Sequence, residues 1–165
     1  MLPLYQYING KANEKKAFFT ELSFKYISEI KAVLAAKNLS DTIIQPYGSM
    51  MNNFMVDDEE ADLDICIVPQ TISIEEFAPL LEDLEKALVN KGLAILERRH
   101  SNERYALLKM KDRASNTTVD MTVHTMLPIY NTKLIRLYSL YDQRFHIIGI
   151  YFKHWVKMNK IGGAP

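Results

Sequence analysis

The chain has 165 residues, enough for one domain or for one domain and part of a second. Hydrophobic residues make up 48% of it and 20 basic residues balance 20 acidic ones, which excludes a disordered chain and one that grips long nucleic acid by its overall charge. The single cysteine, Cys66, cannot form an internal disulfide. With no signal-peptide pattern and no apolar run of membrane-spanning length, we expect an intracellular protein without a membrane segment.

The order of the predicted elements indicates an α+β fold. We expect, in chain order, a helix from Asn13 to about Lys37, a strand over 42–47, a short helix over 49–55, an acidic loop over 57–60, a strand over 63–68, a helix over 73–91, and strands over 93–100, 105–111 and 117–124. The helices rest on apolar residues at helical spacing, and the strands on alternation of apolar and polar residues. These elements form a mixed sheet of about five strands with flanking helices.

Two helices are predicted after Pro128, over 129–141 and 144–160. The second is apolar nearly all round, and a helix of that kind is normally buried. We therefore expect a protein partner or a further C-terminal segment to cover residues 144–160.

Three aspartates carry the strongest chemical signal. In ADLDICIV, the side chains of Asp62 and Asp64 leave the strand on one face, with about 7 Å between their Cα atoms, while the apolar residues enter the core. The same alternation in NTTVDMTVH directs Asp120 outward. Three carboxylates on adjacent strands can hold two Mg²⁺ ions about 3.5 to 4 Å apart, the spacing used for in-line phosphoryl transfer. The alternative is a set of solvated acids on a half-exposed sheet.

Two further features favour the metal site. Gly48 and Ser49 stand between a strand and a helix, where a tight turn and free N–H groups favour phosphate, although a plain helix cap would look similar. Lys153 and Lys157 lie four residues apart, hence on one helix face, and can neutralise phosphates. Their alternative role is a solvated basic face.

These residues resemble a known family, the noncanonical poly(A) polymerases and terminal uridylyltransferases of the DNA polymerase β-like nucleotidyltransferase superfamily. YGSMMNNFMVDDEEADLDICIV resembles the Gly-Ser, spacer, Asp-x-Asp signature of the family, and Asp120 matches its third acid. NTKLIRLYSLYDQRFHIIGIYFKHWVKMNKI resembles the segment that enters the second domain of the family. The resemblance runs from about Pro46 to Ile161.

The resemblance implies a polymerase β-like fold and a role for each residue. Asp62, Asp64 and Asp120 would hold two Mg²⁺ or Mn²⁺ ions, and Asp120 would help to deprotonate an RNA 3′-hydroxyl. The nucleoside triphosphate, UTP or ATP, would meet Gly48, Ser49, Asn131, Thr132, Lys153 and Lys157. The implied domains are an N-terminal helix over 1–40 that packs on the helical domain, a catalytic domain over 41–127, and the start of a truncated helical domain over 128–165.

The expected activity is transfer of a nucleoside monophosphate to an RNA 3′ end, with UMP preferred over AMP. Departures from the family pattern are Asn53 in place of glycine, Ala61 in place of serine, and Tyr105-Ala106 in place of Val-Pro; none removes a charged catalytic group. Two alternatives remain open. One is a non-catalytic subunit that uses this fold as an interaction platform, and the other is a nucleotidyltransferase that acts on a small molecule or a protein.

Overall fold

The computed structural model describes residues 2–56, 62–101 and 105–161, so the predicted acidic loop over 57–60 lies outside the described residues. The elements are α1 (Leu2–Ala36), β1 (Ile43–Tyr47), α2 (Gly48–Asn52), β2 (Asp62–Val68), the 3₁₀ turn η1 (Ile74–Glu76), α3 (Phe77–Val89), β3 (Leu93–Ser101), β4 (Tyr105–Asp112), β5 (Thr118–Val123), α4 (Met126–Tyr141) and α5 (Gln143–Met158). The predicted strands are confirmed to within two residues at each end.

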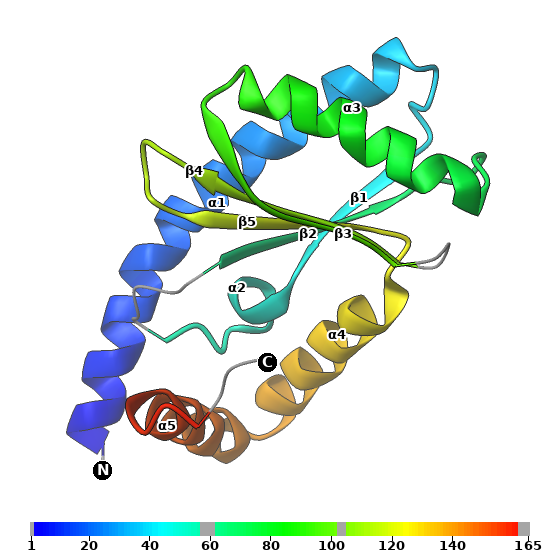
Figure 1. Ribbon diagram of the computed structural model, residues 1–165. Helices are drawn as coiled ribbons and strands as arrows, with labels where there is room; N and C mark the ends of the chain where they lie inside the picture. The colour runs from blue at the N-terminus through cyan, green and yellow to red at the C-terminus, as the bar shows by residue number, and fades with distance from the viewer. Residues whose placement is uncertain (1, 57–61, 102–104, 162–165) are drawn as a thin grey trace.

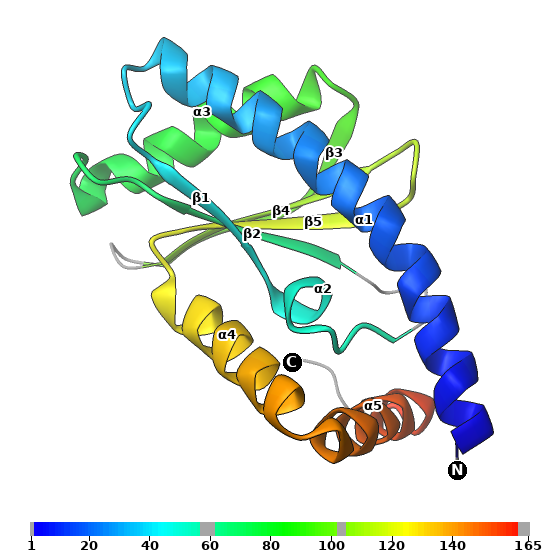
Figure 2. The same ribbon diagram turned by 180° about the vertical axis from the view of Figure 1, so that it is seen from behind.

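The five strands form one mixed sheet in the order β1-β2-β5-β4-β3. β2 and β5 run parallel, and the other three pairs are antiparallel. Helices α1 and α3 cover one face of the sheet, whereas α2, α4 and α5 lie on the other side (Figures 1 and 2). The expected mixed sheet with flanking helices is confirmed.

The main hydrophobic core fills the space between the sheet and the pair α1 and α3. Leu63, Ile65 and Ile67 of β2 are fully buried in it, as are Val119 and Met121 of β5. Because side chains alternate along a strand, burial of this apolar set fixes which face each strand turns away from the core. The opposite face is the one that carries the aspartates.

Helix α1 starts eleven residues before the predicted start, so the prediction that it begins at Asn13 was wrong. Its buried apolar residues already include Ile8 and Ala12, which precede Asn13. This N-terminal part packs on α5, where the Tyr5 backbone N–H donates to Tyr151 Oη at 3.2 Å. The same helix therefore reaches from the main core to the far side of the molecule.

Helix α5, which we expect a partner or a further segment to cover, is largely exposed in the described structure. In α5 only His146 and Ile150 are buried, while large apolar side chains such as Phe152 and Trp155 are 64% and 53% exposed. One face of α5 packs on α1 and on the segment after α2, and nothing in the described part of the chain covers the rest. No described helix has the length and apolar character needed to cross a membrane.

Gly149 lets α5 approach the segment that follows α2. A Cβ atom there would lie 2.1 Å from Cε1 of the buried Phe54 ring, whereas one on Gly10 of α1 would meet nothing within 4 Å. Both positions are helical, so the gain in helix propensity is similar in Gly149→Ala and Gly10→Ala. We expect Gly149→Ala to be less stable than Gly10→Ala by about 1–3 kcal/mol, the usual cost of overpacking. Urea unfolding of the two variants measures the difference, and equal stabilities would contradict the packing described.

Candidate active site

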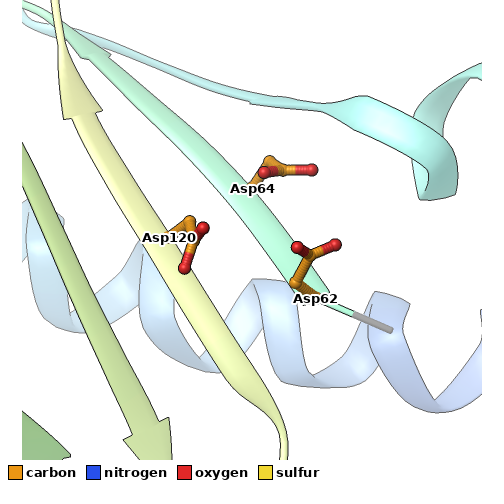
Figure 3. A group of neighbouring side chains, drawn as sticks. All are labelled: Asp62, Asp64 and Asp120. Carbon is orange, nitrogen blue, oxygen red and sulfur yellow. The ribbon is translucent and has the colours of Figure 1, made fainter. Parts of the chain in front are cut away.

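The three predicted aspartates meet on the open face of the sheet. Asp62 and Asp64 lie two residues apart on β2, and Asp64 is directly opposite Asp120 in the parallel register with β5. One carboxylate oxygen from each residue lies within 4.8 Å of the other two. Figure 3 shows the side chains pointing into a shared space from the two neighbouring strands. The pairing of β2 with β5, two strands that are far apart in the sequence, thus brings all three acids together.

The electrostatics of this cluster favour a bound cation. Burial, reinforced by the charges of Asp62 and Asp120, raises the pKa of Asp64 to about 8. Burial also raises the pKa of Asp120, whose Oδ1 is buried and has no hydrogen-bond partner in the described structure. Carboxylates this close are stable as anions only with positive charge between them, and oxygen ligands suit Mg²⁺. The residues present therefore fit a divalent metal site.

Lys109 is a member of the site that the sequence analysis missed. It stands opposite Asp120 in the antiparallel register of β4 and β5, and its Nζ donates to Asp120 Oδ2 at 3.1 Å. This ion pair acts to lower the pKa of Asp120, but burial has the larger effect and the pKa is raised overall. With Oδ2 held in this way, Oδ1 is left for the triad. The available signal was alternation: Lys109 follows buried Leu108 and precedes buried Met110, so it shares the face of the acids.

The Gly48–Ser49 turn packs directly on the triad. Gly48 has φ of +78°, and a Cβ atom there would lie 1.9 Å from Asp64 Oδ2, so two independent constraints require glycine. Ser49 lies in the first turn of α2, which faces β2 across this contact. This is the turn for which the sequence predicts contacts with phosphate.

Thr132 reaches the same turn from α4. Its buried hydroxyl accepts the Gly48 backbone N–H at 2.9 Å and donates to the Pro128 carbonyl at 2.7 Å. The sequence predicts that Thr132 contacts the nucleotide, whereas in the structure its hydroxyl bonds to the backbone. Asn131, the preceding residue, is exposed on α4.

The two predicted lysines differ in their surroundings. Lys153 Nζ donates to the Phe54 carbonyl at 2.9 Å, and its pKa is lowered by burial while Asp62 and Asp64 act in the opposite direction. Lys153 therefore lies within the field of the triad. Burial and the charge of Lys15 lower the pKa of Lys157.

Comparison with protein families gives one matching family model. The model is described as the poly(A) RNA polymerase, mitochondrial-like, central palm domain, and it matches residues 10–140. The matched range contains the triad, the Gly48–Ser49 turn, Lys109 and Thr132.

Known proteins with similar sequences are RNA nucleotidyltransferases by name. The chain is 26% identical over 119 residues to poly(A) RNA polymerase GLD2-B of Xenopus laevis, covering 71% of this chain and 23% of that protein. It is 27% identical over 132 residues to terminal uridylyltransferase 7 of Homo sapiens, covering 74% of this chain and 8% of that protein. The chain thus spans less than a quarter of the length of these relatives.

Solved structures share the fold at low identity. A cytoplasmic RNA terminal U-transferase superposes with a TM-score of 0.75 at 18% identity, over 98% of this chain and 46% of that one. The structure of mtPAP in complex with GTP superposes with a TM-score of 0.70 at 16% identity, over 83% of this chain and 32% of that one. The expected polymerase β-like nucleotidyltransferase fold is confirmed.

The raised pKa of Asp64 predicts a pH dependence of stability. Without divalent ions, the folded chain keeps the Asp64 proton up to about pH 8, whereas the unfolded carboxyl releases it near 3.8. The folded state binds more protons between these values, so the free energy of unfolding should fall as pH rises from about 5 to 8. Urea unfolding in EDTA measures this slope. Asp64→Asn should flatten it, and Asp41→Asn, at an exposed acid between α1 and β1, should keep it; an unchanged slope in Asp64→Asn contradicts the assignment.

The bond between Gly48 and Thr132 can be tested by a nearly isosteric change. Thr132→Val leaves the Gly48 N–H without its acceptor, and we expect a loss of about 1–3 kcal/mol in the free energy of unfolding. Thr132→Ser keeps a hydroxyl in the same position and should recover most of that loss. Chemical denaturation of the three proteins provides the measurement. Val and Ser variants of equal stability would show that the hydroxyl does not hold the turn.

Proposed function

The chain belongs to the family of the mitochondrial-like poly(A) RNA polymerase central palm domain, and we propose that it is the catalytic part of a template-independent RNA 3′-terminal nucleotidyltransferase. In this reaction an RNA 3′-hydroxyl attacks the α-phosphate of a nucleoside triphosphate, and pyrophosphate leaves. The observation that carries the proposal is the cluster of Asp62, Asp64 and Asp120, whose oxygens gather within 4.8 Å beside the glycine turn.

We propose that the three carboxylates hold two divalent ions, Mg²⁺ or Mn²⁺, which when bound stabilise the charge of in-line phosphoryl transfer. Asp120 accepts the proton of the attacking hydroxyl through Oδ1, because Lys109 occupies Oδ2. Lys109 is a positioning residue in this scheme. It keeps the Asp120 side chain in one orientation and supplies positive charge at the edge of the triad.

The remaining residues bind the triphosphate in our proposal. Ser49 donates from its hydroxyl to a phosphate oxygen, and Lys153 offsets the charge of the departing pyrophosphate from its position near the acids. Lys157, one turn further along α5, extends the same positive face. Asn131 contacts the ribose, while Thr132 acts through the Gly48 backbone that it holds.

We prefer UMP as the transferred group, with AMP as the alternative. The relatives include proteins named for either reaction, a terminal uridylyltransferase and poly(A) RNA polymerases. We also keep the expected division into residues 1–40, a catalytic unit over 41–127 and a helical segment over 128–165.

A second candidate function rests on the apolar surface of α5. Ile148 and Met158 are 66% and 71% exposed, in addition to Phe152 and Trp155. Exposed apolar patches of this kind favour a protein partner or a further segment of chain that covers them. The chain would then be a non-catalytic subunit that uses this face for assembly. The complete triad favours catalysis over that alternative.

Nucleotide transfer to RNA tests the leading proposal. The protein, in its longest available form, is incubated with Mg²⁺, an RNA oligonucleotide and labelled UTP, ATP, CTP or GTP, and extension is followed on a denaturing gel. We expect incorporation with UTP or ATP, abolished by EDTA and lowered at least about 100-fold by Asp120→Asn. Asp41→Asn, at an exposed acid between α1 and β1, is the matched control and should retain activity. No incorporation by the wild type, with the same blank for Asp62→Ala, contradicts the proposal.

A further inference from the structure

A polar cavity lies outside the acidic triad. It has a volume of about 320 Å³ and opens between α1, α4 and α5 beside the C-terminal end of α2. Figure 2 shows how these four elements come together on the side of the sheet away from α3. The side chains that give it its character are Asn9, Lys16, Asn53, Arg136, Gln143 and His146.

The charged side chains described in this lining are both basic. Lys16 and Arg136 face the cavity from α1 and α4, and no carboxylate is among the described residues that line it. An overall excess of basic residues does not explain the basic lining, because acidic and basic residues are equal in number in the chain. Asp142 precedes the lining residue Gln143, but both of its carboxylate oxygens accept hydrogen bonds from Arg144.

Both cations keep N–H groups that no described residue uses. Lys16 Nζ donates to Asn53 Oδ1 at 3.1 Å, and Arg136 donates from one terminal nitrogen to the Met51 carbonyl at 2.9 Å. A lysine ammonium carries three N–H groups and an arginine guanidinium five, so most remain available in each side chain. Their present acceptors are neutral amide oxygens. An anion would therefore be a stronger acceptor than either of them.

The chemistry of the lining selects a phosphate over an organic ring. Pockets for small organic ligands are lined mainly by apolar and aromatic side chains, whereas the lining of this cavity consists mostly of hydrogen-bonding groups. Lysine, arginine and amide side chains are the groups that contact phosphate oxygens of nucleic acids. The ligand class that fits is a single phosphate group.

Helix α5 relates the cavity to the triad. His146, which lines the cavity, and Lys153, which lies in the field of the acids, are seven residues apart and so share one face of α5. Seven residues of helix correspond to about 10 Å. At about 3.4 Å of axial rise per nucleotide, that distance corresponds to roughly three nucleotides of one strand.

We propose that this cavity binds one backbone phosphate of the RNA substrate, a few nucleotides before its 3′ end. The inference rests on the proposed function, since it assigns a subsite to the RNA of that reaction. Lys16 and Arg136 supply the charge, and Asn9, Gln143 and Asn53 supply neutral donors at the rim. The subsite positions the strand and reads no base, as backbone contacts do.

The first test adds a negative charge to the cavity without changing its size. Gln143 is exposed and makes no hydrogen bond in the described structure, so Gln143→Glu should fold normally. Anisotropy of a fluorescein-labelled 15-nucleotide RNA measures the dissociation constant in EDTA, without nucleotide. We expect about fivefold weaker binding for Gln143→Glu at low salt, where a surface charge acts most strongly. Gln70→Glu adds the same charge elsewhere and should bind as the wild type does.

The second test counts the phosphate contact. The logarithm of the binding constant falls with the logarithm of salt concentration by about 0.7 for each phosphate contacted on a single strand. We expect Lys16→Gln with Arg136→Gln to make the slope shallower by about 0.7. The matched double variant Lys31→Gln with Arg113→Gln removes two exposed charges elsewhere and should keep the slope. Circular dichroism confirms that each variant is folded.

Four outcomes would overturn the subsite. Equal weakening by the cavity variants and their controls would indicate a general charge effect, and wild-type protein that binds no RNA would exclude the site. If inorganic phosphate raises the melting temperature of the wild type but not of the Lys16 and Arg136 variant, while RNA affinity is unchanged, the ligand is a small phosphorylated molecule. If the wild type transfers nucleotides and the cavity variants bind RNA as tightly as the wild type does, this inference is wrong and the proposed function stands. If the wild type transfers no nucleotide, the proposed function is wrong.

Discussion

Three carboxylates within 4.8 Å of one another are the constraint on which this structure depends. Their mutual repulsion and burial raise the pKa of Asp64 far above its ordinary value, so the metal-free site is a source of instability. Lys109 and Lys153 offset part of this cost from two sides, one through an ion pair and the other through its field. Proteins retain such unfavourable clusters where function requires them.

The sheet imposes the cluster through its other face. Leu63, Ile65, Val119 and Met121 are completely buried, and each sits one residue from an aspartate of the triad. A shift of one residue in the pairing of β2 with β5 would turn these side chains to the site and the acids to the core. The hydrophobic core therefore fixes the register, and the register brings Asp64 opposite Asp120. The alternation of apolar and acidic residues along β2 and β5 therefore determines both the packing of the core and the geometry of the site.

The sequence predicted what depends on local periodicity and missed what depends on tertiary neighbours. Alternation in β2 and β5 was enough to identify Asp62, Asp64 and Asp120 and the face that they share. Alternation in β4 could have placed Lys109 on the face of the acids, but it does not show that β4 lies beside β5, so it could not identify Lys109 as the partner of Asp120.

The predicted start of α1 was wrong for a related reason. The start of α1 depends on contacts of its first turns with α5, which no local pattern encodes. The apolar character of α5 indicated that the described elements would leave part of it uncovered, and its exposed side chains agree with that. Similarly, the hydroxyl of Thr132 could be assigned to Gly48 only after α4 was seen against α2.

Helix α2 shows why the late helices belong to the site. It has five residues, and a helix of that length has little stability of its own. Its first N–H is held by Thr132 of α4, and the Met51 carbonyl near its end is held by Arg136 of the same helix. The segment that follows is held by α5, since His146 contacts the Asn53 carbonyl at 2.7 Å. The glycine turn on Asp64 is therefore set by the helices after residue 125, so residues on both sides of the expected boundary at 127 shape the candidate site.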